Sequence, residues 1–288
     1  PNPEIVNSNV RDNIVLEIGT PRRLRNLNGI VLSLLTGGGG NENYFHWLYD
    51  VLPRIGICSK LVGLSEIDFF LLPNLSKKFQ NETLDCLNIP KHKRLSSEKY
   101  RHIKAKELIV TDHPVVVTGN STRDIQNIPS WIMLWLKKNF NDQKITNNKN
   151  IKNKIYIERD SENFKNTSLR SVSNENEVKR YLLKNNFISI KLGEIKFSEQ
   201  VDLFYNADCI VGLHGAGFAN LVFCKPGTKV IELRSPDAGY VIANLAKKNN
   251  LNHSSIIAEA KHSRRYNFSN QQGHIQIPIS SLAKILEN

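Results

Sequence analysis

The sequence is poor in cysteine and has no long hydrophobic segment. Four of its 288 residues are Cys, at positions 58, 86, 209 and 224, and no two of them have the Cys-x-x-Cys spacing. They are typical of small reduced core residues, which predicts a cytoplasmic protein. The longest hydrophobic segment, residues 128–136, ends at two lysines. It is shorter than the roughly 18–20 apolar residues that cross a membrane, so we expect no transmembrane helix.

Several motifs of metal and nucleotide chemistry are also missing. The sequence has no Asp-x-Asp pair, no Gly-x-x-x-x-Gly-Lys-Ser/Thr phosphate loop and no Gly-x-Ser-x-Gly elbow. Nor do Cys and His cluster at the spacing of metal ligands. The sequence therefore predicts neither a metal site nor a bound cofactor.

Positive charge is in excess, with a formal net charge of +12 that is spread over both halves of the chain. It is densest in residues 91–106, where no aromatic ladder or nucleic-acid motif accompanies it. We therefore do not expect a nucleic acid as partner. Two interpretations stay open: a solvated basic surface, or domains that face anionic ligands or an anionic membrane surface.

Short strand-like and helix-like segments alternate along the chain, which is typical of a parallel α/β architecture. The strands expected in the first half are 30–35, 68–73 and 107–112, and the helices are 43–62, 76–89 and 128–140. The second half is expected to hold strands 154–159, 187–192, 208–213 and 229–234, and helices 174–186, 198–207 and 238–250. Between the halves, residues 141–154 have the polar composition of a linker. We predict two Rossmann-like domains, residues 1–148 and 149–288, with a last helix that could return to the first domain.

A glycine-rich corner, "IVGLHGAGFANLVFCKPGTKVIEL", lies at residues 210–233. From Gly215 it reads Gly-x-Gly-x-x-Asn, with Asn220 where a dinucleotide fingerprint has its third glycine. The following helix has room for only about two turns, and Glu232 comes early for a ribose-binding acid. A dinucleotide site is therefore disfavoured. The corner still predicts an anion site, formed by His214, the backbone at the two glycines and a helix start. The alternative is that the glycines only turn the chain and His214 packs.

Three polar residues share one face of the expected helix 43–62. His46, Asp50 and Arg54 are each four residues apart. Asp50 or His46 could act as a general base on a hydroxyl group. The alternative is an ordinary helical ion pair between Asp50 and Arg54.

A further candidate lies at the end of the strand 154–159. Arg159 closes this strand and so falls at the carboxyl edge, where α/β sheets bind ligands. Arg170 follows in a loop, and Asn174 begins the next helix. An arginine at such an edge suits a phosphate group, although an ordinary surface arginine is an equally good interpretation.

Taken together, three segments resemble glycosyltransferase family 61, which includes bacterial capsular polysaccharide biosynthesis proteins. They are "NYFHWLYDVLPR", "YIERD…LRSVSNENEV" and "FSEQVDLFYNADCIVGLHGAGFANLVFCKPGTKVIEL". The resemblance implies a GT-B fold, in which two Rossmann-like domains face a central cleft and the C-terminal one binds the donor. It also implies a metal-independent, inverting transfer from a nucleotide sugar, usually a UDP-sugar, to a glycan or polysaccharide hydroxyl. Such an enzyme could sit at the inner face of the membrane.

The resemblance also assigns roles to single residues. The donor diphosphate would be held at His214, Gly215, Ala216, Gly217 and Asn220. Arg159 would contact phosphate or nucleotide, and Glu232 the ribose. Asp50 would be the base, with His46 as the second candidate. Additional substrate contacts would come from Asn43, Arg54, Arg170 and Asn174. This chain has "GFAN" where relatives often have "GLTN", so Ala219 removes a hydroxyl contact.

Two other functions stay open. One is a different sugar-nucleotide enzyme such as an epimerase, which the missing third glycine disfavours. The other is a non-catalytic module of the same fold that binds a nucleotide or glycan.

Overall fold

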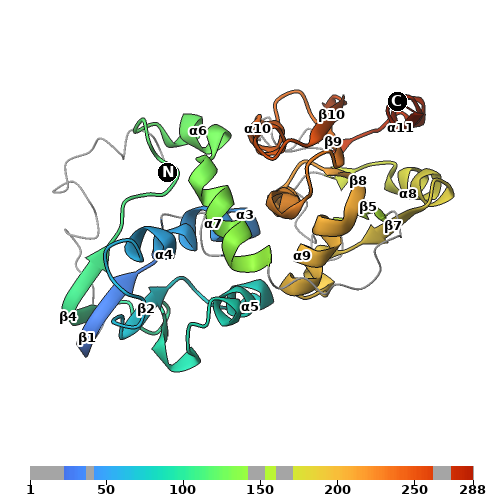
Figure 1. Ribbon diagram of the computed structural model, residues 1–288. Coiled ribbons are helices and arrows are strands. Elements are labelled where there is room, and N and C mark those ends of the chain that lie inside the picture. Colours follow the sequence, from blue (N-terminus) through green and yellow to red (C-terminus); the bar gives the residue numbers. More distant parts are fainter. Residues whose placement is uncertain (1–22, 37–41, 142–152, 160–170, 262–273, 288) are drawn as a thin grey trace. The chain divides into compact units, whose positions relative to one another are not determined.

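The computed structural model of the protein describes residues 23–36, 42–141, 153–159, 171–261 and 274–287 (Figure 1). The chain divides into two compact units, Pro1–Pro114 and Val115–Asn288. Each unit contains its own parallel β-sheet. The α/β class predicted from the alternating segments is therefore confirmed.

The first unit is built on four parallel strands in the order β3-β2-β1-β4. The strands are β1 (Arg25–Ser33), β2 (Phe69–Leu72), β3 (Arg94–Ser96) and β4 (Ile103–Val110). The helical segments are α3 (Tyr44–His46), η2 (Trp47–Val51), α4 (Pro53–Cys58), α5 (Lys78–Cys86) and η3 (Lys91–Lys93). From β1 the chain adds β2 and then β3 on one side of β1, and afterwards places β4 on the opposite side of β1. The carboxyl ends of β1 and β4 therefore form a topological switch point, where open α/β sheets bind ligands.

The helix expected over residues 43–62 is interrupted in the structure. It begins as one α-helical turn, widens into the π-helix η2, and continues as α4 from Pro53. In the π-helix the N–H of Leu52 donates to the carbonyl of Trp47 at 3.0 Å. Pro53 has no N–H to donate to the carbonyl four residues before it, so the α-helical hydrogen-bond pattern is broken there. Single π-helical turns occur frequently at functional sites.

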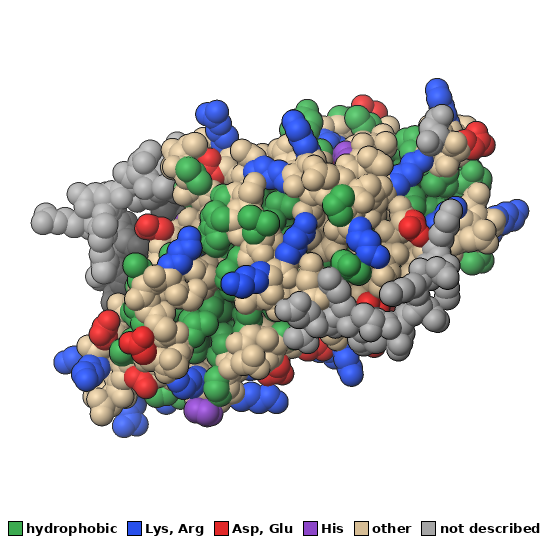
Figure 2. All heavy atoms as spheres, viewed as in Figure 1, with side chains coloured by type: hydrophobic (Ala, Val, Ile, Leu, Met, Phe, Trp, Pro, Cys, Tyr) green, Lys and Arg blue, Asp and Glu red, His purple; other side chains and the backbone are tan. Residues whose placement is uncertain are grey.

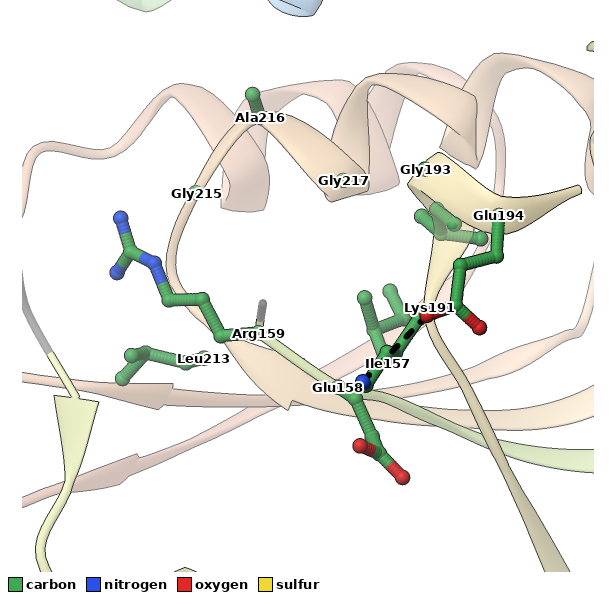
Figure 3. A pocket seen from close by; sticks show the side chains of 11 residues that line it. Ile157, Glu158, Arg159, Lys191, Gly193, Glu194, Leu213, Gly215, Ala216 and Gly217 are labelled. Atoms are coloured by element: carbon green, nitrogen blue, oxygen red, sulfur yellow. Dashed lines mark ion pairs between the residues drawn. The ribbon is translucent and has the colours of Figure 1, made fainter. Parts of the chain in front are cut away.

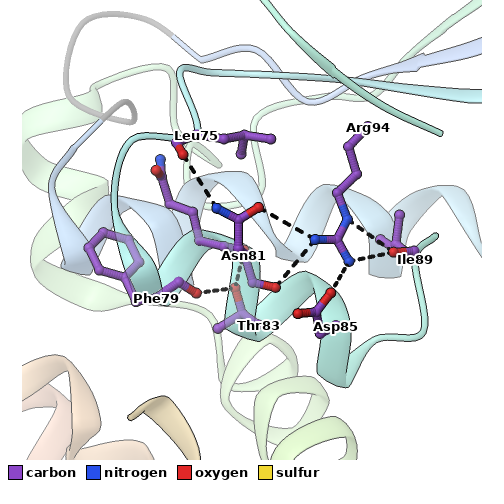
Figure 4. A network of polar contacts seen from close by, with 8 residues as sticks. Leu75, Phe79, Asn81, Thr83, Asp85, Ile89 and Arg94 are labelled. Carbon is purple, nitrogen blue, oxygen red and sulfur yellow. Dashed lines mark hydrogen bonds and ion pairs between the residues drawn. The ribbon is translucent and has the colours of Figure 1, made fainter. Parts of the chain in front are cut away.

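Polar side chains join α5 to the strand and loops beside it (Figure 4). Arg94 donates to the carbonyl of Ile89 at 3.0 Å and pairs with Asp85. Lys93 donates to the carbonyl of Ile67. These two members of the basic segment 91–106 therefore stabilise the fold. On the face seen in Figure 2, Lys and Arg side chains are dispersed among other side chains.

The second unit contains five parallel strands in the order β10-β9-β8-β5-β7. They are β5 (Asn153–Ile157), β7 (Phe187–Ile190), β8 (Ala207–Leu213), β9 (Lys229–Arg234) and β10 (Asn252–Ile257). A small sheet combines β6 (Ser171–Val172), β11 (Ala260–Lys261) and β12 (His274–Ile275). Since β7 lies on one side of β5 and β8 on the other, the switch point of this sheet lies between β5 and β8.

Helices cover both faces of this five-stranded sheet. On one face, α8 (Glu175–Lys184) and α11 (Ile279–Glu287) pack together over a core that includes Val211 and Leu233. On the other face, η7 (Ala216–Phe223) contacts α9 (Phe197–Asn206) and α10 (Val241–Lys248). The short segment η6 (Leu192–Glu194) connects β7 to α9. The last helix, α11, thus packs on α8 and β10 of its own unit.

The helices before the expected linker also pack with the second unit. These are α6 (Ser121–Asp124), η4 (Ile125–Asn127) and α7 (Ser130–Phe140). The ring of Phe140 meets that of Phe197 edge to face at 4.9 Å, and Gln126 accepts from the N–H of Tyr240. The division between compact units therefore falls at Pro114 instead of the expected residue 148. In the described part of the chain, no helix is both long and apolar enough to span a bilayer.

Candidate functional site

A pocket of about 220 Å³ lies at the switch point of the second unit, at the carboxyl edge of the sheet (Figure 3). Its walls are residues 157–159 at the end of β5, residues 191–194 after β7, and Leu213 with residues 215–217 at the end of β8. The predicted positions Arg159, Gly215, Ala216 and Gly217 are thus brought together because the parallel strands β5 and β8 end at the same edge. The predicted Arg170 lies outside the described residues.

Gly215 and Gly217, which both line this pocket, differ in how much space a side chain would have. A Cβ on Gly217 would lie 3.1 Å from side-chain carbons of both Ile157 and Leu192, closer than these carbons pack comfortably. At Gly215 the nearest atom would be 3.7 Å away, and its φ of 168° is extended backbone. Gly217 is therefore needed for close approach, whereas Gly215 leaves its neighbours room for a side chain.

The segment η7 begins at this pocket and is a 3₁₀-helix of eight residues. The first N–H groups of a helix have no carbonyl partner within it, so Ala216 and Gly217 offer donors to an anion. Asn220, by contrast, is completely buried and donates to Gln200 at 2.9 Å. Its observed role is to hold η7 against α9; a contact with the diphosphate stays a prediction.

Four charged residues line the pocket: Glu158, Arg159, Lys191 and Glu194. Arg159 extends toward the chain at Gly215 (Figure 3). Lys191 lies 3.4 Å from Glu194, with which it forms an ion pair. Glu158 forms an ion pair with Lys179 at 2.7 Å and accepts a hydrogen bond from Ser189. Burial alone would raise the pKa of the Glu158 carboxyl, but these contacts outweigh burial and lower it. Arg159 is therefore the cation at this edge best placed for a phosphate.

Behind the corner, a buried carboxylate joins two histidines. Glu232 is completely buried, and its two oxygens bond to Nδ1 of His214 and, at 2.9 Å, to Nε2 of His253. Burial by itself raises the pKa of Glu232, but the bonds from both imidazoles outweigh it and hold the pKa at about 2. The predicted ribose contact of Glu232 stays untested, although both oxygens already have partners. His253 was missed because no motif marks it; only the pairing of β10 with β9 brings it to Glu232.

A second cluster lies in the first unit, at the switch point between β1 and β4. His46 Nδ1 bonds to Asp50 Oδ2, and Asp50 is only 5% exposed. Its other oxygen, Oδ1, is buried and has no hydrogen-bond partner among the residues that the structure describes. Arg54 donates to the backbone carbonyl of Asp50 at 3.1 Å and to that of Thr111 at 3.1 Å. The observed contact between Asp50 and Arg54 is thus not the carboxylate–guanidinium pair of the alternative interpretation.

His113 also belongs to this cluster, and the sequence reading did not single it out. Burial lowers the pKa of His113; the charge of Asp50 opposes this shift, and those of Arg54 and His46 add to it. Burial likewise lowers the pKa of Arg54, against the charges of Asp50 and Asp112. His113 comes three residues after β4 ends, and that position at a carboxyl edge was the available signal.

Two predicted substrate contacts have structural roles. Asn43 caps the helix after β1, accepting from the N–H of Phe45 at 2.9 Å. Asn174 exchanges two hydrogen bonds of 2.9 Å with the backbone of Ile277. Any contact with substrate stays a prediction for both residues. Within the described ranges, no three His, Cys, Asp or Glu side chains are grouped so that they could hold a metal ion.

Comparison with known proteins shows similarity to a family and to a characterised enzyme. Residues 44–231 match the sequence model of the family described as Glycosyltransferase 61. The EGF domain-specific O-linked N-acetylglucosamine transferase of Gallus gallus is 35% identical over 72 residues. That similarity covers 23% of this chain and only 14% of the relative. The family match includes the residues that line the pocket and the cluster of His46, Asp50 and Arg54, but it ends before Glu232 and His253.

Proposed function

The chain belongs to glycosyltransferase family 61, and on that premise we propose that it moves a sugar from a nucleotide-sugar donor to a hydroxyl group of a glycan. The observation that carries this proposal is the pocket between β5 and β8. It combines close backbone approach at Gly217, the N-terminus of η7 and the guanidinium of Arg159. These groups suit the diphosphate of a nucleotide sugar, because each offers N–H donors or positive charge to phosphate oxygens.

In the proposed reaction Asp50 is the general base. Its buried oxygen Oδ1 has no partner in the described structure, while His46 holds Oδ2. The carboxylate takes the proton of the acceptor hydroxyl, whose oxygen forms a bond to the anomeric carbon of the donor sugar. The bond from that carbon to the diphosphate breaks in the same step, so the configuration inverts. Arg159 and the amides of Ala216 and Gly217 stabilise the charge of the leaving diphosphate.

The finer features rest on the family resemblance and are part of the proposal. We propose a UDP-sugar as donor, a surface polysaccharide or related glycan as acceptor, and a GT-B architecture that needs no metal. The separate parallel sheets, each with a polar cluster at its switch point, are compatible with that architecture. A cytoplasmic location and contact with an anionic membrane surface stay predictions.

A panel of nucleotides tests the proposal. UDP, GDP and CMP are added to the protein and the melting temperature is measured; we expect UDP to raise it, because a ligand that binds only the folded state stabilises that state. Arg159→Ala should abolish the rise. Arg180→Ala, which changes an exposed arginine on α8, should leave it intact. If no nucleotide stabilises the wild type, the proposal is wrong.

Assays of UDP-sugar hydrolysis and of transfer then separate an enzyme from a binding module. A protein that binds UDP but neither hydrolyses nor transfers any donor sugar would be a non-catalytic member of the family. A product sugar that stays attached to UDP with changed stereochemistry would indicate an epimerase.

A further inference from the structure

Glu232 occupies a position where an ionised carboxylate is costly. It is completely buried on β9, and each oxygen bonds to one imidazole, that of His214 or that of His253. Replacing buried charged groups by hydrophobic side chains is often neutral or stabilising, so stability alone does not account for such an arrangement. The other charged residue on this face of β9, Arg234, donates instead to the carbonyls of Ser235 and Pro236.

The contact at Nδ1 determines what the other nitrogen of His214 can do. An ionised carboxylate only accepts hydrogen bonds, so Nδ1 of His214 carries the proton that faces Glu232. Nε2 can then donate to a phosphate oxygen only if the ring is protonated and positively charged. The carboxylate held against Nδ1 fixes the orientation of the ring, as carboxylates beside other functional histidines do.

His253 determines where the carboxylate of Glu232 lies. It approaches from β10 on the side away from β8, and its bond to Oε2 leaves Oε1 for His214. His253 does not line the pocket. His214 is not among the lining residues either, but it lies between Leu213 and Gly215, both of which line the pocket.

We infer that His253 is a positioning residue for donor binding: through Glu232 it orients the ring of His214, so that Nε2 of His214 can donate to the donor diphosphate. The inference rests on the proposed function, since it assumes that a nucleotide diphosphate occupies the pocket. It also gives Glu232 a role different from the predicted ribose contact.

Two substitutions at one position test this inference. His253→Leu removes the donor to Glu232, whereas the amide of His253→Gln can supply an N–H at a similar reach and cannot be charged. The ligands are UDP, inorganic pyrophosphate and uridine, and their dissociation constants are measured by calorimetry. His92→Leu changes an exposed histidine of the first unit and is the matched control. Circular dichroism checks that each variant is folded at the temperature of the measurement.

We expect His253→Leu to weaken UDP and pyrophosphate about tenfold, the size of losing a hydrogen bond to a charged group. Uridine, which lacks phosphate, should bind equally well to all variants. His253→Gln should bind UDP within about twofold of wild type. In proton NMR, the downfield N–H resonance of the His214–Glu232 bond should be present in wild type and His253→Gln and lost in His253→Leu.

Three results would overturn the inference. The first is unchanged UDP affinity in His253→Leu, and the second is an equal loss for uridine and UDP, which would indicate a general structural effect. The third is a His253→Gln variant that is as weak as His253→Leu. If the wild type itself binds neither UDP nor pyrophosphate, the proposed function fails, and this inference fails with it.

Discussion

Asn220 donates through Nδ2 to Oε1 of Gln200 at 2.9 Å, and this bond fixes η7 to α9. Gln200 in turn donates to the carbonyl of Leu192, also at 2.9 Å. Leu192 lines the pocket at the carboxyl edge of the second sheet. A chain of two side-chain amides therefore connects the turn after β8 to the turn after β7, and so holds two walls of the pocket.

Replacing Asn220 by alanine should destabilise the protein. The substitution leaves Oε1 of Gln200 buried without this donor, and an unsatisfied buried group costs about 1–3 kcal/mol. We expect a drop of that size in the free energy of unfolding, measured by urea denaturation. Asn176→Ala, on the exposed surface of α8, should change it by no more than about 0.5 kcal/mol. Equal effects of the two substitutions would contradict the role given to Asn220.

The two glycines of the corner should respond differently to alanine. In Gly217→Ala the added methyl group lies 3.1 Å from Ile157 and Leu192, so the neighbours must move and the pocket narrows. Overpacking of this kind costs about 1–3 kcal/mol. Gly215→Ala has 3.7 Å of room and an extended backbone, so we expect little loss of stability. Thermal unfolding of both variants checks this order; a larger loss for Gly215→Ala would contradict it.

Local patterns in the sequence were sufficient to predict most strands of the two main sheets, but not β3 or β10. The strands expected at 208–213 and 229–234 correspond closely to β8 and β9. The position of Arg159 after a strand was enough to place it at the carboxyl edge, because parallel strands end together.

Contacts between distant segments were not predictable from local patterns. Helix α7 has an ordinary amphipathic sequence, and only the packing of Phe140 on Phe197 assigns it to the second unit. His253 has no motif around it, and its role depends on the pairing of β10 with β9. The π-helical turn that contains Asp50 could not be predicted from the spacing of apolar residues either, because the same residues fit an α-helix equally well.

Replacing Asp50 by asparagine should remove transfer and leave donor binding intact. The amide keeps the shape of the side chain but cannot take a proton from the acceptor, and general bases contribute about 10²–10⁴-fold to rate. We expect a loss of that size in kcat for transfer, together with an unchanged dissociation constant for UDP. Asp208→Asn, at the exposed amino end of β8, should retain full activity. Normal turnover in Asp50→Asn would show that another group is the base.

Acid should lower the free energy of unfolding, because it protonates the carboxylate of Glu232. Against the opposing effect of burial, the bonds from His214 and His253 hold its pKa at about 2, compared with an ordinary value of 4.5. Because the folded carboxyl group loses its proton more readily than the unfolded one, its contribution to stability is fully present above pH 4.5 and is lost as the pH falls toward 2. The shift corresponds to about 3 kcal/mol in the free energy of unfolding.

In Glu232→Gln, which cannot titrate, this part of the pH dependence should vanish, whereas Glu107→Gln on the exposed edge of β4 should retain it. Denaturation curves at several pH values between 6 and 2 measure the difference, and parallel profiles for wild type and Glu232→Gln would contradict the assignment.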